Sequence, residues 1–222
     1  MLRKWEELPK WMQTKEVREY YDILSKRKIS LFLKRIFDVV TALILLIFLA
    51  VPMAGIAVWI VLDSKGSVFY RQVRVTSYGK KFRIHKFRTM VADAEKTGSQ
   101  VTGNSDKRVT KAGVFLRKYR LDELPQLIDI LENNMSFVGT RPESIAYIPF
   151  YTKEMYATLL LPAGITSEAS IRYKDEAKLL SDAKSIDEIY IKKILPEKMK
   201  YNIESIKNFS FLGDLRTMWR TV

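Results

Sequence analysis

The chain has 222 residues, a formal net charge of +13, no cysteine and a single histidine, His85. Without cysteine there is no disulfide framework, no thiolate zinc site and no Cys-His catalysis, and a lone histidine excludes zinc sites built on several histidines. Carboxylates, basic side chains and a hard metal such as Mg2+ remain for any chemistry. The basic excess indicates anionic partners such as phospholipid head groups, phosphorylated substrates or nucleic acid.

Residues 1–30 are expected to form an N-terminal amphipathic helical extension, because large apolar residues recur there at roughly helical spacing. Two placements fit this pattern. The helix can lie in the head-group layer of a membrane, or it can pack on the domain or on a partner chain. The last arrangement would give a homo-oligomer through the N-terminal helix.

An apolar segment runs from Val39 to Leu62 and contains no charged side chain. A membrane-crossing helix needs roughly 20 apolar residues, so this segment is long enough. It predicts a protein that resides on a membrane. A helix buried inside a soluble protein is the less favoured alternative.

Pro52 interrupts this segment, and a proline within a helix removes a hydrogen bond and collides with the carbonyl four residues back. The positive-inside rule places short basic flanks in the cytoplasm. Residues 31–63 are therefore expected to form a re-entrant membrane helix hairpin broken at Pro52, with a straight spanning helix as the alternative. The basic flanks are Lys26, Arg27, Lys28, Lys34 and Arg35 before the segment, and Lys65, Arg71, Arg74, Lys80 and Lys81 after it.

Two short stretches rich in Val, Phe, Tyr and Ile follow, Ser67–Val73 and Lys81–Phe87, with a turn between them. They predict a small β-hairpin. In its second strand His85 falls on the face opposite Phe82 and Ile84, so it is expected to be a surface or cross-strand residue without a catalytic role. The polar residues 92–113 then predict a long loop, which is either a lid over a site or a plain connection.

Apolar residues from Leu121 to Leu131 recur at helical spacing, with Asp129 on the opposite face. The pattern predicts a helix with Asp122 as its N-cap and Pro125 in its first turn. The helix N-terminus and nearby arginines would favour the ionised form of Asp122 and attract anions. From these residues alone, an ordinary capping aspartate beside a solvated Glu123 is the favoured interpretation, because Asp is among the commonest N-cap residues.

The C-terminal part is expected to be mostly helical, ending in an interfacial helix with Leu215, Met218 and Trp219. Core packing is the alternative for this last helix. The expected fold is α+β and mainly helical, with residues 64–222 forming one catalytic domain. The three preceding helices are predicted at Tyr173–Ser181, Ser185–Leu195 and Glu197–Lys207.

Several motifs in order resemble the bacterial sugar transferases, the monotopic polyprenyl-phosphate phosphoglycosyl transferases. The likeness extends over residues 31–175 and, more weakly, from Lys198 to the end. Single motifs of this kind are weak, but eight in sequence order are strong. They are Lys34–Asp38 with the apolar segment, Phe69–Arg74, Lys86–Met90, Asp106–Thr110, Leu116–Arg117, Leu121–Leu127, Met135–Gly139 and Arg141–Pro142.

The resemblance implies transfer of a sugar-1-phosphate from a UDP-sugar to undecaprenyl phosphate, giving a polyprenyl-diphosphate-sugar and UMP. This is the first membrane step of bacterial glycan assembly. It also implies a location on the bacterial inner membrane, with the catalytic domain on the cytoplasmic face. A carboxylate needs no histidine to activate it at neutral pH, and transfer between polyanions needs cations and a metal.

By the same resemblance, Asp122 attacks the β-phosphate and forms a covalent phosphosugar intermediate, and Asp122 and Glu123 hold Mg2+. Arg141 would clamp phosphate, with Arg117, Lys86 and Arg88 as further candidates. Asp214 would be an additional carboxylate near the metal.

The chain departs from the family pattern at Val51, at Thr140 and around Ala163 to Ser167. These departures concern sugar and lipid specificity and leave the Asp-Glu dyad intact. The alternative function is a non-enzymatic membrane scaffold that binds anionic lipid. A nucleic-acid binder is disfavoured, because no recognised binding motif is present.

Overall fold

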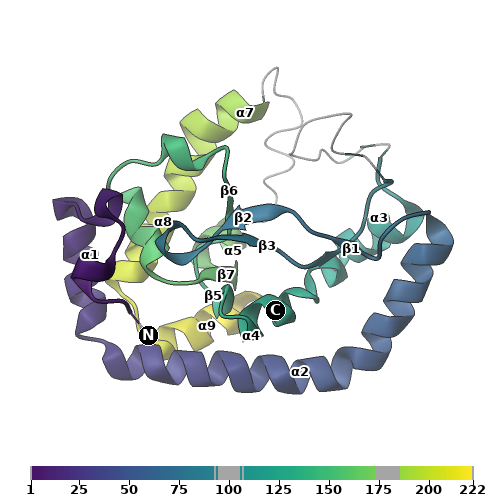
Figure 1. Cartoon of the computed structure of the whole chain (residues 1–222), viewed down its shortest axis with the longest axis horizontal. Coiled ribbons are helices and arrows are strands. Elements are labelled where there is room, and N and C mark those ends of the chain that lie inside the picture. Colours follow the sequence, from purple (N-terminus) through teal and green to yellow (C-terminus); the bar gives the residue numbers. More distant parts are fainter. Residues whose placement is uncertain (1, 93, 95–105, 107, 174–185, 222) are drawn as a thin grey trace.

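The computed structural model describes residues 2–92, 94, 106, 108–173 and 186–221. One long helix, α2, runs along the lower edge of the molecule, and the remaining elements lie above it (Figure 1). The fold is mainly helical, as the sequence predicted, and the described residues form three small sheets where the sequence predicted one hairpin. Most of the predicted loop at 92–113 and most of the predicted helix Tyr173–Ser181 lie outside the described residues.

Helix α2 extends without interruption from Lys28 to Asp63, with Pro52 inside it. The predicted break at Pro52 is therefore wrong. The helix is bent and turns upward toward its C-terminal end (Figure 1). A proline removes one backbone hydrogen bond and crowds the preceding turn, which bends a helix without ending it.

Both ends of α2 are anchored to the same domain. Near its start, the Lys34 ammonium donates to the Val138 carbonyl at 2.8 Å, and Asp38 accepts from the backbone N–H of Phe137 at 3.2 Å. Near its end, Asp63 accepts from the backbone N–H of Ala112 at 2.9 Å. Its last turns also pack on this body, since Ile60 is buried with Phe87 and Leu116.

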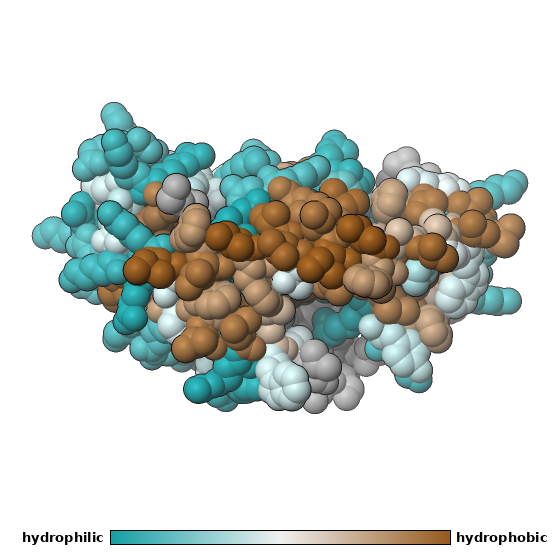
Figure 2. All heavy atoms as spheres, turned by 90° about the horizontal axis from the view of Figure 1, so that it is seen from below, coloured by the Kyte–Doolittle hydropathy of each residue, from teal (hydrophilic) through white to brown (hydrophobic). Residues whose placement is uncertain are grey.

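Between these anchors α2 exposes an apolar surface. Only 6 % of an apolar stretch of 18 residues within α2 is buried, so α2 is not the core helix of a soluble protein. Seen from below, hydrophobic residues form a broad band across the molecule (Figure 2). Such a large exposed apolar surface is typical of contact with a membrane. The exposed side chains of α2 include Ile44, Ile47, Phe48, Val51, Val58, Val61 and Leu62.

The N-terminal segment contains two single-turn helices, η1 (Trp5–Glu7) and η2 (Lys10–Met12), before helix α1 (Lys15–Ser25). The predicted helix over residues 1–30 is thus correct only from Lys15. The apolar stripe of this segment is buried in the chain's own core, so of the two predicted placements the structure has packing on the domain. The buried residues of the segment are Leu8, Met12, Val17, Tyr20 and Leu24, which pack with Leu159, Leu160, Ile206 and Phe209.

The predicted β-hairpin is confirmed, in two separate ladders. Strand β1 (Phe69–Tyr70) pairs with β4 (Lys86–Phe87), and β2 (Val73–Val75) pairs with β3 (Lys81–Arg83), all antiparallel. Strand β6 (Glu143–Ser144) joins the free side of β2. Strands β2 and β3 of the hairpin lie near the centre of the molecule (Figure 1).

A parallel pair forms the other sheet, β5 (Met135–Val138) with β7 (Ala163–Thr166). Two glycines allow the backbones of this pair to approach each other closely. A methyl group on Gly164 would lie 2.1 Å from the backbone nitrogen of Gly139, and one on Gly139 would lie 2.6 Å from the Pro162 carbonyl oxygen. The close backbone approach holds the chain that leads into Arg141.

The remaining helices surround these strands. Helix α8 follows directly on a π-helical turn, so Pro196 lies in the first turn of α8 and causes no break there. In α9 Thr217 is buried and Trp219 is 85 % exposed, so the last helix combines packing with an open apolar face. The bounds are α3 (Lys111–Lys118), η5 (Leu121–Glu123), α4 (Gln126–Leu131), η6 (Ile148–Phe150), η7 (Met155–Leu160), α5 (Glu168–Arg172), α7 (Ile186–Ile189), η8 (Tyr190–Ile194), α8 (Leu195–Lys207) and α9 (Phe211–Thr221).

The Gly139–Gly164 contact can be tested by Gly164→Ala. The added methyl group meets backbone atoms at 2.1 Å, and overpacking of this kind costs about 1–3 kcal/mol. We expect a lower Tm in detergent. Gly55→Ala is the control, because nothing lies within 4 Å of a methyl group at that position. An unchanged Tm for Gly164→Ala would contradict the close approach.

Candidate active site

The predicted dyad lies in a single 3-10 turn, η5, between α3 and α4. Arg120 adopts a left-handed backbone conformation, with φ of 54°, which starts this tight turn after α3. Helix α4 begins only at Gln126, and its N-cap is Pro125. The predicted N-cap role of Asp122 is therefore wrong, because the 3-10 turn places this residue before the helix rather than at its first amide groups.

Glu123 is the electrostatic centre of the site. It is 9 % exposed and pairs with the Lys86 ammonium at 2.9 Å. The Arg141 guanidinium forms a second ion pair with the same carboxylate and also donates to the Ile165 carbonyl at 3.3 Å. Burial raises the pKa of Glu123, but Arg141 and Lys86 outweigh burial and hold that pKa well below its usual range.

Asp122 is different, because no described residue donates a hydrogen bond to its carboxylate. Burial raises the pKa of Asp122, and the nearby charge of Glu123 acts in the same direction. Lys86, Arg117 and Arg141 lower this pKa and oppose the effect of burial. The site thus combines a paired carboxylate with an unpaired one in a shared cationic environment.

Arg117 and Arg88 have separate roles, although both were predicted from the sequence as candidates for phosphate binding. The side chain of Arg117 donates to the Thr89 hydroxyl at 2.9 Å and acts electrostatically on Asp122. Arg88 is buried and donates to the carbonyls of Ser64 and Lys65 at 2.6 and 2.5 Å. It caps the C-terminal end of α2, where free carbonyls need donors, so the structure does not support its prediction as a phosphate ligand.

Asp214 lies on α9 and pairs with the Lys34 ammonium at 2.6 Å. The two residues line a cavity of about 440 Å³ that does not include Lys86 or Arg141. The structure therefore does not bring Asp214 together with the dyad residues. Its ion pair instead connects α9 to the start of α2.

His85 is buried at 8 % exposure, so the prediction of a surface position is wrong. Its backbone N–H and its Nδ1 both lie 2.8 Å from carboxylate oxygens of Asp129. Asp129 is fully buried, and its predicted place on an open helix face is also wrong. The paired hydrogen bonds with His85 replace the solvation that burial removes.

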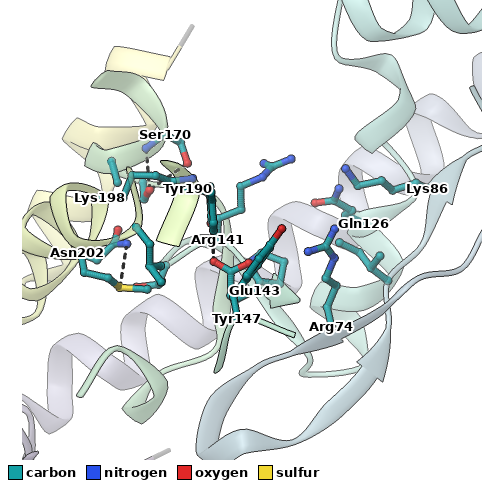
Figure 3. A pocket seen from close by; sticks show the side chains of 17 residues that line it. Arg74, Lys86, Gln126, Arg141, Glu143, Tyr147, Ser170, Tyr190, Lys198 and Asn202 are labelled. Carbon is teal, nitrogen blue, oxygen red and sulfur yellow. Dashed lines mark hydrogen bonds between the residues drawn. The ribbon is translucent and has the colours of Figure 1, made fainter. Parts of the chain in front are cut away.

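A second cavity of about 270 Å³ begins beside the dyad, since Lys86 and Arg141 both line it. Gln126, Arg74 and Tyr190 lie around the same hollow (Figure 3). None of these three residues was predicted from the sequence as a site residue. Gln126 alone had a signal, because it follows Asp122 by four positions and so lies near it on a helical path.

The donor set of the dyad fits a Mg2+ ion that is shared with a phosphorylated ligand. Mg2+ is usually held by one or two carboxylates together with substrate phosphates and water. Asp122 can ligate directly because its carboxylate has no described partner, whereas Glu123 is already neutralised by Lys86 and Arg141.

Comparison with known proteins identifies the family of the chain. Residues 29–222 match the family model described as bacterial sugar transferase, and the chain belongs to this family. A relative from Bacillus subtilis (strain 168), a putative undecaprenyl-phosphate N-acetylgalactosaminyl 1-phosphate transferase, is 39 % identical over 160 residues. This match covers 71 % of the chain and 87 % of the relative.

Two longer relatives are 33 % identical to the chain. One is the UDP-N-acetylgalactosamine-undecaprenyl-phosphate N-acetylgalactosaminephosphotransferase of Aeromonas hydrophila, matched over 86 % of the chain and 43 % of the relative. The other is the UDP-glucose:undecaprenyl-phosphate glucose-1-phosphate transferase of Escherichia coli (strain K12), matched over 87 % of the chain and 40 % of the relative. The chain thus spans less than half of these two proteins.

The raised pKa of Asp122 predicts a stability effect. The carboxyl of Asp122 has a higher pKa in the folded chain than in the unfolded chain. Its protonated form therefore stabilises the fold at pH values below the unfolded pKa, and this stabilisation is lost as the pH rises through the folded pKa. At neutral pH the ionised Asp122 therefore opposes folding, and Asp122→Asn should raise the Tm in detergent. The gain should disappear as the pH falls toward about 4, where the carboxyl is protonated. A lower Tm for Asp122→Asn at pH 7 would contradict this reading.

Proposed function

We propose that the protein transfers a sugar-1-phosphate from a UDP-sugar to undecaprenyl phosphate and releases UMP. The observation that carries the proposal is the half-buried carboxylate of Asp122, which accepts no hydrogen bond from a described residue and lies among the charges of Lys86, Arg117 and Arg141. Family membership and the activities after which the relatives are named support it.

In the first step, a carboxylate oxygen of Asp122 attacks the β-phosphorus of the UDP-sugar. The bond from this phosphorus to the bridging oxygen breaks, and UMP leaves with the electron pair. Asp122 then carries the sugar phosphate as an acyl phosphate. Burial makes the carboxylate more basic, which favours its attack as a nucleophile, while the surrounding cations keep the ionised form accessible.

In the second step, a phosphate oxygen of undecaprenyl phosphate attacks the same phosphorus. The bond to Asp122 breaks, the carboxylate is regenerated, and polyprenyl-diphosphate-sugar is released. Arg141 and Lys86 would bind the phosphate oxygens in both steps, and their ion pairs with the Glu123 carboxylate support this role.

Asp122 and Glu123 would hold Mg2+ together with the donor diphosphate. When bound, the ion would neutralise charge that develops on the leaving phosphate. Glu123 would have to share its negative charge between the metal and its two cationic partners.

We further propose that α2 enters the inner membrane from the cytoplasmic face and returns to it. Its 36 residues would span about 54 Å if straight, at about 1.5 Å per residue. A straight helix through a bilayer would separate the two ends, yet both ends contact one catalytic domain. The bend at Pro52 would keep the dyad at head-group level, where a lipid phosphate can reach it.

The nucleophile is tested by Asp122→Asn with a panel of UDP-sugars, polyprenyl phosphate and Mg2+. An amide cannot form the covalent intermediate, so UMP release should fall on the order of 10³-fold or more. Glu132→Gln is the control, since Glu132 is an exposed carboxylate on the neighbouring helix end. Substantial activity of Asp122→Asn would exclude Asp122 as nucleophile, and no UMP release by the native chain would favour the lipid-binding scaffold.

The topology is tested by labelling single cysteines, which the chain otherwise lacks. Cysteines at the exposed positions Lys26 and Ser67 should both react with a membrane-impermeant reagent from the cytoplasmic side. A cysteine at Val51, on the apolar surface of α2, should be protected in intact membranes and serves as the control. If the cysteines at positions Lys26 and Ser67 reacted from opposite sides of the membrane, this result would contradict re-entry.

A further inference from the structure

Gln126 is a buried amide without a partner. Its side chain is 1 % exposed, and neither its oxygen nor its nitrogen has a hydrogen-bond partner among the described residues. Burying an amide without compensating hydrogen bonds is costly, and native structures rarely do so without a reason. The exception at Gln126 therefore points to a ligand.

The amide belongs to the 270 Å³ cavity that begins at Lys86 and Arg141. Figure 3 shows Gln126 beside Lys86 at one end, with Asn202 at the other. Asn202 is also buried, and its side-chain oxygen has no partner among the described residues. A cavity with two such amides is built for a polar ligand. Its volume lies at the lower limit of small-molecule sites and suits one ring rather than a whole nucleotide sugar.

The position of Gln126 relative to Asp122 indicates whether the cavity binds the sugar ring or the uracil ring of a UDP-sugar. Four residues of 3-10 and α-helical backbone separate the two, which corresponds to roughly 6–8 Å along the path. In a UDP-sugar, the sugar is joined to the attacked phosphorus through one oxygen. The uracil is farther away, beyond the second phosphate and the ribose.

We infer that Gln126 binds the sugar ring of the donor. Its amide oxygen accepts from one ring hydroxyl, and its amide nitrogen donates to a neighbouring polar substituent. Gln126 is then a specificity-determining residue rather than a catalytic one. The inference rests on the proposed function, since it takes Asp122 as the site of attack.

The test measures binding of UDP, UDP-glucose and UDP-N-acetylgalactosamine by calorimetry, with Mg2+, to the full chain in lipid nanodiscs. Gln126→Met has a similar shape and no hydrogen-bonding group. It should weaken the tighter-binding UDP-sugar by about 10- to 100-fold, as expected for two lost neutral hydrogen bonds. Binding of UDP should be unchanged, because UDP has no sugar at this end.

Two controls separate binding from folding. Gln126→Met should not lower the Tm of the free protein, because it removes a buried amide that has no partner. Gln13→Met replaces an exposed glutamine of the N-terminal segment and should leave both affinities unchanged. Analogues of the UDP-sugar that each lack one hydroxyl identify the contact. Gln126→Met should not weaken binding of the analogue that lacks the hydroxyl contacted by Gln126, because that contact is already absent.

Each other outcome overturns the inference. Equal weakening of UDP and UDP-sugar would mean that Gln126 binds the nucleotide. Unchanged binding of both, with a lower Tm for Gln126→Met, would mean that ordered water satisfies the amide and that it has a structural role. Absence of UDP-sugar binding by the native chain would instead contradict the proposed function.

Discussion

The double ion pair at Glu123 is the interaction on which the site depends. It joins three parts of the chain that lie far apart in sequence: the end of the β-hairpin at Lys86, the 3-10 turn at Glu123 and the turn at Arg141. Removing one member of a buried charge group leaves the others uncompensated, so the cluster acts as a unit. Lys86 and Arg141 pair with Glu123, whereas the adjacent Asp122 accepts no hydrogen bond from a described residue.

Helix α2 supplies the second constraint. Hydrogen bonds from Lys34, Asp38 and Asp63 fix its two ends to the domain, while the middle of the helix stays exposed. Arg88 adds donors to the free carbonyls at its end. The apolar surface and the charged site are thereby held in one rigid arrangement, which suits chemistry on a lipid phosphate.

Much of this was predictable because it follows from local patterns. The apolar segment and the hairpin are each encoded within about ten to twenty-five neighbouring residues. The role of the Asp-Glu dyad, in contrast, was assigned only through the resemblance carried by eight motifs in sequence order. The roles of Arg88, Asp214, His85 and Gln126 were not predictable in this way. Each depends on a partner or a cavity wall supplied by a distant segment: Ser64 for Arg88, Lys34 for Asp214 and Asp129 for His85. A break was expected at Pro52, but the helix continues through this residue.

The N-terminal packing has a consequence for the limits of the folding unit. The family match begins at residue 29, yet Leu8, Met12 and Val17 share a core with Leu159 and Leu160. A chain trimmed to the matched residues would leave that face of the catalytic domain uncovered and prone to aggregation. The cooperative unit of this protein is therefore larger than the part it shares with its family, and its boundary is set by burial rather than by likeness.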